Sequence, residues 1–212
     1  MSDYYTSGPV ALVRGIITVK IWTIQSLKVW ELLSEQKILY VQPDLCEERP
    51  SFPDAYSWMC QKMRERLPDY QEHLPWWGWY QPKPDLRFYS RKGVNNTQWV
   101  RIELDIPTSK VLLSYESAWF AVLNGLFVAY TDAEYEKWDQ EIDERGLNEW
   151  RRPLPEPWES QLVKSWDNIF DLNNLNNSGG WSNIIQANFE ELRLADVVAV
   201  KHFKVRSSVT TQ

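Results

Sequence analysis

Alternating apolar and polar positions predict several β-strands along the chain. Residues 98–106 (QWVRIELDI) alternate strictly, with the apolar side chains from Val100 to Ile106 on one face. Residues 16–25 (IITVKIWTIQ) are rich in β-branched residues, which favour strands. Shorter strands are expected at 38–41 and 111–114, and two more at 183–192 and 197–205, separated by a tight turn at 194–196.

Helical spacing and capping signals predict helices between these strands. Ser26 can cap a helix over 27–36, and Thr131 with Glu134 three residues later forms a capping box for a helix to about Arg145. Other helices are expected over 54–67, 115–126 and 158–170. Residues 73–87 (HLPWWGWYQPKPDLR) contain three prolines and cannot form a long helix. The Asn- and Gly-rich residues 173–180 are expected to form a loop.

These elements predict a single α+β domain. It covers residues 16–206 and consists of a mixed or split β-sheet with inserted helices. Residues 1–15 and 207–212 are expected to be flexible tails, because the first segment is polar and shows no periodic pattern. No change of composition along the chain indicates a boundary between domains.

The composition is that of an ordinary globular protein, with 43% hydrophobic and 25% charged residues among 212. The formal net charge of -6 disfavours broad binding to nucleic acid. No apolar run reaches the roughly 18 residues of a membrane-spanning helix, and the first residues show no secretory signal. The cysteines and histidines are Cys46, Cys60, His73 and His202, which indicate neither a disulfide framework nor a metal site. A cytoplasmic protein without a bound metal or a membrane contact is therefore expected.

The usual catalytic signatures are missing, since the chain has no Walker loop, no dinucleotide glycine fingerprint, no G-x-S-x-G turn and no H-E-x-x-H helix. Two other features stand out. The first is a total of 13 tryptophans, most of which fit a buried core. The second is an aromatic and basic stretch that could stack on a base and pair with phosphate. It comprises Trp77, Trp79, Tyr80, Gln81, Lys83, Arg87, Arg91 and Lys92. The alternative is a loop that packs its tryptophans under a solvated basic rim.

Two further groups of polar residues follow predicted strands. Ser114 and Tyr115 stand at a strand-to-helix junction, where they could contact a ligand or simply cap the helix. In residues 186–191 (QANFEE), strand parity places Gln186, Asn188 and Glu190 on one face and Glu191 on the other. If the glutamate on the polar face points into a cleft, it is a candidate functional residue. The alternative is that the polar face is simply turned to solvent.

Several blocks of the chain together resemble an uncharacterised bacterial family, the domain of unknown function DUF3841. They are IWTIQSLKVW at 21–30, AYSWM at 55–59, PWWGWYQPKPDLR at 75–87, VRIELDIP and VLLS within 100–114, WFAVLN at 119–124, KSWDNIF at 164–170 and IQANFEELRL at 184–193. The resemblance covers about residues 18–205 and implies no established activity.

The order of the strands is also similar to the ADP-ribosyltransferase-like arrangement, in which a split sheet grips NAD. That resemblance implies roles for residues on three strands. Thr23 or Gln25 would hold the adenosine-side ribose, Ser114 or Tyr115 would position the nicotinamide, and Glu190 or Glu191 would orient the other ribose and stabilise developing positive charge.

The leading hypothesis is thus a nucleotide-type cleft with NAD as cofactor, in a protein that could catalyse ADP-ribosyl transfer. Trp77 or Trp79 would stack on a ring and Arg87 would pair with phosphate. The candidate catalytic residues are Glu190, Glu191 and Ser114; the candidate binding residues are Thr23, Gln25, Trp77, Trp79, Tyr80, Gln81, Arg87, Tyr115 and Gln186. The alternative is a non-catalytic regulatory protein whose tryptophan-rich cleft holds a peptide or protein partner. A carbohydrate-binding protein is a third hypothesis.

Overall fold

A β-sheet of seven strands organises the part of the chain that the computed structural model describes, which is residues 10–13, 16–42, 52–81, 83–86, 97–174 and 184–204. Its order is β6-β7-β4-β2-β5-β9, and β1 pairs with β2 beside this path. The strands are β1 (Val10–Val13), β2 (Ile16–Ser26), β4 (Trp76–Gln81), β5 (Gln98–Pro107), β6 (Val111–Tyr115), β7 (Ile185–Phe189) and β9 (Val197–Lys204). Strands β3 (Ile38–Tyr40) and β8 (Glu191–Arg193) form a second, small sheet.

Helices connect these strands. They are α1 (Leu27–Gln36), α2 (Pro53–Arg66), α4 (Glu116–Leu123), α5 (Asp132–Glu144) and α6 (Trp158–Ser165), with short 3₁₀ helices at Thr108–Lys110 (η3), Trp166–Phe170 (η4) and Leu194–Asp196 (η6). The prediction of an α+β fold is therefore confirmed. The strand pairings among the described residues are all antiparallel, so the large sheet is antiparallel rather than mixed.

The local signals in the sequence act as expected. The Ser26 side chain accepts a hydrogen bond from the Val29 amide and begins α1. The Thr131 side chain accepts from the Glu134 amide, while the Glu134 carboxylate accepts from the Tyr130 amide, so α5 begins with a capping box shifted by one residue. Strand β5 buries each apolar side chain of its alternating pattern.

Four predicted segments differ from the structure, and one of them, the strand expected over 183–192, is divided into β7 and β8 of different sheets. Val10–Val13 lie in the expected N-terminal tail but pair with β2 as strand β1. The helix expected to reach 126 ends at Leu123, because Gly125 turns the chain with a left-handed φ of 68°. The predicted helix over 158–170 is α-helical only to Ser165 and continues as η4.

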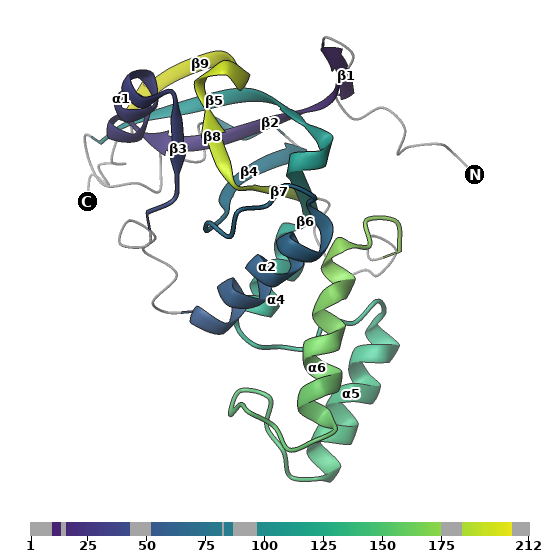
Figure 1. The fold of residues 1–212 in the computed structure, drawn as a ribbon. Helices are drawn as coiled ribbons and strands as arrows, with labels where there is room; N and C mark the ends of the chain where they lie inside the picture. The colour runs from purple at the N-terminus through teal and green to yellow at the C-terminus, as the bar shows by residue number, and fades with distance from the viewer. Residues whose placement is uncertain are drawn as a thin grey trace, which may run out of the picture.

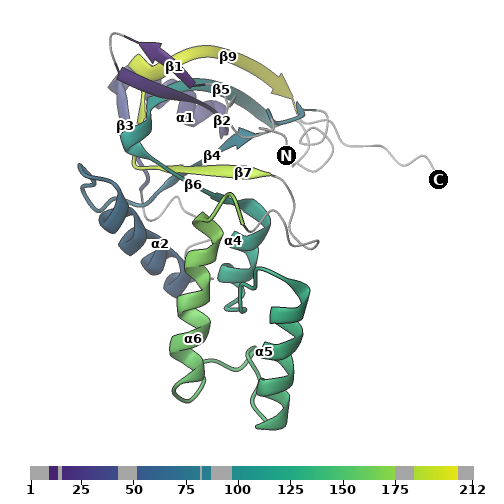
Figure 2. The ribbon, with the colours of Figure 1, turned by 90° about the vertical axis from the view of Figure 1, so that its right-hand side faces the viewer.

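Each face of the large sheet has its own hydrophobic core (Figures 1 and 2). Helix α1 covers one face through Leu33, which packs with Ile21, Ile102 and Phe189. Helices α2 and α4 lie against the other side, and α5 and α6 extend farthest from the sheet in both views. This second core is aromatic: Trp58 stacks on Phe170 with ring centroids 5.6 Å apart.

The large sheet is split into two halves. Strand β2 pairs with β5 at every position from Thr18 to Ser26, but it pairs with β4 at one position, Trp22 opposite Trp79. One half thus contains β1, β2, β5 and β9, and the other contains β4, β7 and β6. A Cβ atom on Gly78 would lie 2.5 Å from Cγ2 of Ile21, so glycine is required where the halves approach.

Candidate functional site

The contact between the two sheet halves gathers many of the predicted site residues. Trp22 pairs with Trp79, Trp79 with Gln186, and Gln186 with Ser114. Directly paired residues of antiparallel strands project to the same face, so these four form one row across four strands. At about 4.8 Å between strands, the row is about 14 Å long. We call this region, with Thr23, Trp77 and Asn188, the sheet join.

Buried polar side chains occupy the far side of the sheet join. The Gln186 amide nitrogen donates to Oγ of Ser114 over 3.0 Å, and this hydroxyl lies 3.5 Å from Oδ1 of Asn188. Ser114 and Asn188 are fully buried, and Gln186 is nearly so. The alternative in which the polar face of this strand is turned to solvent is therefore wrong for Gln186 and Asn188.

Thr23 and Gln25 lie where β2 diverges from β4. Oγ1 of Thr23 donates to the carbonyl oxygen of Trp77 over 2.8 Å, and the Gln25 amide nitrogen donates to Oγ1 of Thr23 over 2.7 Å. Thr23 is fully buried. A side-chain hydroxyl thus satisfies a backbone carbonyl where the backbone ladder between the strands is interrupted.

Trp77 packs into the protein. Its ring centroid lies 4.8 Å from that of Trp119 on α4 and 6.1 Å from that of Tyr56 on α2. Trp77 is also the direct cross-strand neighbour of Asn188. The indole N–H of Trp77 and the side-chain amide nitrogen of Asn188 are both buried, and neither has a hydrogen-bond partner within the described part of the chain.

The other predicted binding residues have different environments. Tyr80 is half-buried between the two cores, and burial raises the pKa of its hydroxyl. Tyr115 is buried and donates its hydroxyl to the carbonyl of Leu172. The backbone of Gln81 pairs with Ile185, at the opposite end of β7 from Glu190. Arg87, Arg91 and Lys92 lie outside the described residues.

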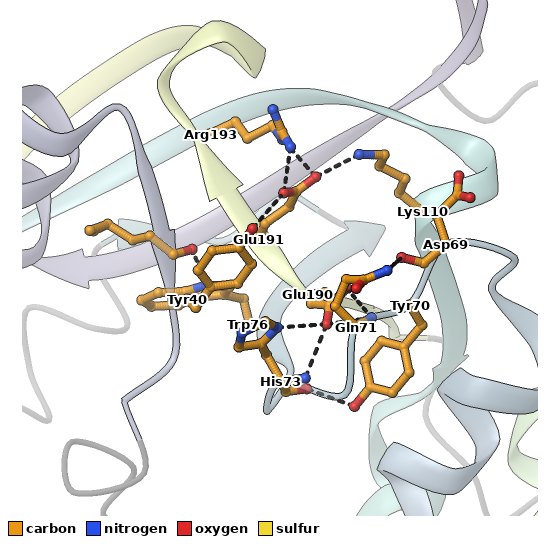
Figure 3. A network of polar contacts seen from close by, with 11 residues as sticks. Tyr40, Asp69, Tyr70, Gln71, His73, Trp76, Lys110, Glu190, Glu191 and Arg193 are labelled. Atoms are coloured by element: carbon orange, nitrogen blue, oxygen red, sulfur yellow. Dashed lines mark hydrogen bonds and ion pairs between the residues drawn. The ribbon is translucent and has the colours of Figure 1, made fainter.

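A charged network surrounds the two predicted catalytic glutamates (Figure 3). Glu190 follows the last residue of β7, and its carboxylate accepts hydrogen bonds from the backbone amides of Gln71 and His73 over 2.8 and 3.0 Å. It also lies 2.9 Å from Nδ1 of His73, whose ring stacks on Tyr40. Glu190 thereby ties the loop after α2 to the end of the large sheet.

Glu191 begins β8 and binds two cations. Nζ of Lys110 lies 2.5 Å from its carboxylate, and Arg193 contacts both carboxylate oxygens at 2.6 Å. Burial alone would raise the pKa of Glu191, but hydrogen bonds from Arg193 and Lys110 lower it to about 2. Glu191 is therefore ionised at neutral pH.

A cavity of about 170 Å³ lies beside these residues. Leu67, Ile106 and Phe189 supply apolar wall. We call it the carboxylate pocket and define it by the polar residues that line it: Tyr40, Asp69, Tyr70, Gln71, Ser109, Lys110, Glu190, Glu191, Arg193 and Asp196. Only the two glutamates were candidates from sequence. Tyr40 and Lys110 come from distant segments, whereas Arg193 and Asp196 follow Glu191 within five residues, and no motif marks any of them.

The structure therefore separates the predicted site into two regions. Thr23, Gln25, Trp77, Ser114 and Gln186 gather at the sheet join. Glu190 lies four residues beyond Gln186, which corresponds to about 13 Å along a strand. Both glutamates are engaged in the carboxylate pocket instead.

Two other properties concern the described residues only. No group of three or more His, Cys, Asp or Glu side chains among them is arranged to hold a metal ion. None of their helices is both long enough and apolar enough to cross a membrane.

Comparison with known proteins shows the family of the chain. A family model described as "Domain of unknown function (DUF3841)" matches residues 20–198. The chain belongs to this family, as its sequence blocks indicate. Searches of the curated proteins and of the solved structures found no match.

Proposed function

We propose that this member of the DUF3841 family binds a nucleotide-type small molecule, such as NAD, at the sheet join. The observation that supports this proposal is the pair of unpartnered buried donors on the cross-strand neighbours Trp77 and Asn188. A buried polar group without a partner costs about 1–3 kcal/mol. A ligand that brings hydroxyl, carboxamide or phosphate oxygens to these donors would remove that cost.

The surroundings of the two donors suit a nucleotide. Trp77 and Trp79 supply aromatic surface, and Ser114 and Gln186, on the same face of the sheet, supply neutral hydroxyl and amide groups. Aromatic faces combined with a few convergent polar groups are typical of small-molecule sites. The row of paired residues is also long enough for a nucleoside.

The geometry supports binding more strongly than ADP-ribosyl transfer. Transfer from NAD needs a carboxylate near the ribose to stabilise positive charge. Glu190 and Glu191 lie in the carboxylate pocket and are already bound by backbone amides, Lys110 and Arg193. The proposal therefore concerns ligand binding, and an assay for nicotinamide release would show whether transfer follows.

Titration with NAD, monitored by tryptophan fluorescence and calorimetry, tests this proposal. We expect saturable binding with a Kd below about 1 mM, which corresponds to roughly 4 kcal/mol. Asn188→Leu should weaken binding at least tenfold, because it removes one donor and keeps the branched side-chain shape. The matched control is Asn124→Leu, since the Asn124 amide donates to Phe120 within α4 and its loss should not change binding. A folded protein that fails to bind NAD, or equal binding by Asn188→Leu, would contradict the proposal.

A specific observation favours partner binding as a second candidate function. Trp150 is 67% exposed, and the segment before it is tied to α5 because Trp138 donates to Glu149. Helix α5 carries seven carboxylates and one lysine. An exposed aromatic anchor beside an acidic helix suits a basic peptide.

A lysine-rich peptide tests this candidate function. It should bind at low salt, and Trp150→Ala should weaken binding about fivefold. Phe120→Ala, which also changes an exposed aromatic residue, is the control. Equal affinity in both variants would exclude Trp150 as an anchor.

A further inference from the structure

The carboxylate pocket is built before any ligand arrives. Four backbone segments converge on it: the end of β3, the loop after α2, the link between β5 and β6, and the run from β7 through η6. Glu190 holds the loop after α2 in place through the amides of Gln71 and His73. The Tyr70 hydroxyl donates to the carbonyl of His73 over 2.6 Å and stabilises the same loop. The wall of the cavity is thus fixed by hydrogen bonds.

The charges around this cavity do not balance. Asp69, Glu190, Glu191 and Asp196 line it together with two cations, Lys110 and Arg193. Both cations bind Glu191. Glu190 is satisfied by amides and His73. The local excess is two negative charges, so the field in the cavity favours a cation.

Among the described residues, neither Asp69 nor Asp196 has a partner for its carboxylate; Asp69 is exposed, so Asp196 is the half-buried carboxylate left for a ligand. It lines the cavity from η6 and is half-buried. No hydrogen bond to its carboxylate is present among the described residues, although Lys110 and Arg193 lie near enough to influence it. Burial raises the pKa of Asp196, which shows that its ionised form is poorly solvated. A cation bound beside Asp196 would therefore pair with a carboxylate that water solvates poorly.

The size and walls of the cavity limit the ligand. At about 170 Å³ the cavity is smaller than the roughly 300–1,000 Å³ of pockets that hold drug-sized ligands, so it suits a short-chain compound. A complete nucleotide is too large. Leu67, Ile106 and Phe189 offer apolar contact for a short alkyl chain, and the lining also includes two aromatic residues, Tyr40 and Tyr70, of a type that attracts cations.

We infer that the carboxylate pocket binds a small organic cation, in which an ammonium or guanidinium group on a short alkyl chain pairs with Asp196. The alkyl chain lies against Leu67, Ile106 and Phe189. This site is separate from the sheet join and does not depend on nucleotide binding there.

Calorimetry with butylammonium tests the inference on the full chain, with butyrate and butanol as probes of similar size that lack the positive charge. Butylammonium should bind saturably below about 10 mM, whereas the other two should not. Amide chemical shifts of Gln71, Lys110 and Arg193 should move in the titration, which places the ligand in this cavity. Failure of butylammonium to bind, or equal binding of butyrate, would overturn the inference.

Two variants connect the binding to the cavity. Asp196→Asn keeps the side-chain size and should weaken binding at least tenfold, while Asp143→Asn on the exposed surface of α5 should not change it. Ser109→Trp adds bulk to an exposed position of the cavity wall and should abolish binding without a change of charge. Ser160→Trp on α6 is its control. Unchanged binding in folded Asp196→Asn would overturn the assignment of this carboxylate.

A further arm distinguishes a free amine from a protein side chain. Tighter binding of a lysine or arginine residue capped at both ends than of butylammonium would identify a peptide side chain as the ligand. Tighter binding of butylammonium or a short diamine would identify a free amine. Either result supports the cation site.

Discussion

Strand β7 carries neutral amides at one end and leads into two glutamates at the other, and the two sets of side chains have different surroundings. Gln186 and Asn188 lie in the closed interior between the sheet and the helices, with one amide nitrogen unpaired. Glu190 and Glu191 lie just past the end of the strand, where backbone amides and two cations bind them. The six residues 186–191 thus contribute neutral amides to one region and ionised carboxylates to another.

The difference follows from the cost of burying charge. An ionised carboxylate is tolerated inside a protein only if donors surround it, whereas a neutral amide loses less when one hydrogen bond is missing. The sheet join can therefore hold unpaired donors, which the proposed ligand would bind. The carboxylate pocket must satisfy its glutamates within the protein, which leaves Asp196 as its half-buried carboxylate without a hydrogen-bond partner among the described residues.

The largest expected effect concerns Glu191, which lies just past the end of β7. The pKa of Glu191 is about 2 in the folded protein, against about 4.5 in the unfolded chain. Its stabilisation is present above pH 4.5 and lost as the pH falls toward 2. A shift of this size corresponds to about 3 kcal/mol at neutral pH. The stability difference between wild type and Glu191→Gln should therefore shrink by more than half between pH 6 and pH 3, as measured by urea unfolding.

Glu136→Gln, on the exposed surface of α5, is the control for this prediction. Its stability difference from wild type should change little over the same range. A Glu191→Gln protein whose difference from wild type is independent of pH would show that Lys110 and Arg193 do not stabilise the glutamate as the geometry indicates.

The sheet join should be most sensitive at Gly78. An alanine there places Cβ 2.5 Å from Ile21 and 3.0 Å from the Trp22 carbonyl oxygen, so the two halves must move apart. We expect a loss of about 2 kcal/mol in the free energy of unfolding, within the range for overpacked cores. Chemical unfolding measures it.

The comparison variant is Gly146→Ala. A Cβ at Gly146 meets no atom within 4 Å, and the cost arises only from its φ of 65°. It should lose about 1 kcal/mol. A smaller loss for Gly78→Ala than for Gly146→Ala would mean that the halves of the sheet separate easily.

The smallest expected effect distinguishes the two ends of β7. Asn188→Leu should leave stability unchanged or raise it by up to about 1 kcal/mol, because it replaces an amide whose nitrogen is unpaired. Glu190→Leu should instead cost about 2 kcal/mol, since two backbone amides lose their acceptor. Thermal unfolding of both variants checks the contrast. A large loss in Asn188→Leu would indicate that Asn188 is a structural residue rather than one that awaits a ligand.

Local structure could be predicted from the sequence where local chemistry decides it. The strict alternation in β5, the Ser26 cap of α1 and the Thr131 cap of α5 act within a few residues, and each is present as expected. Strand β4 gave no such signal, because Trp76 to Gln81 do not alternate. The strand is central in the sheet and is recognised only from its neighbours β2 and β7.

The sequence alone determined the fold class and most helix and strand positions, and it proposed the polar residues of 186–191 as site candidates, which stays a prediction. Tertiary structure decided which of those residues meet. Lys110 and Glu191 are 81 residues apart, and Tyr40 and Glu191 are 151 apart, yet they line one cavity. Pairing over such separations depends on strand order and register, which arise from the packing of the whole domain and not from any short stretch of residues.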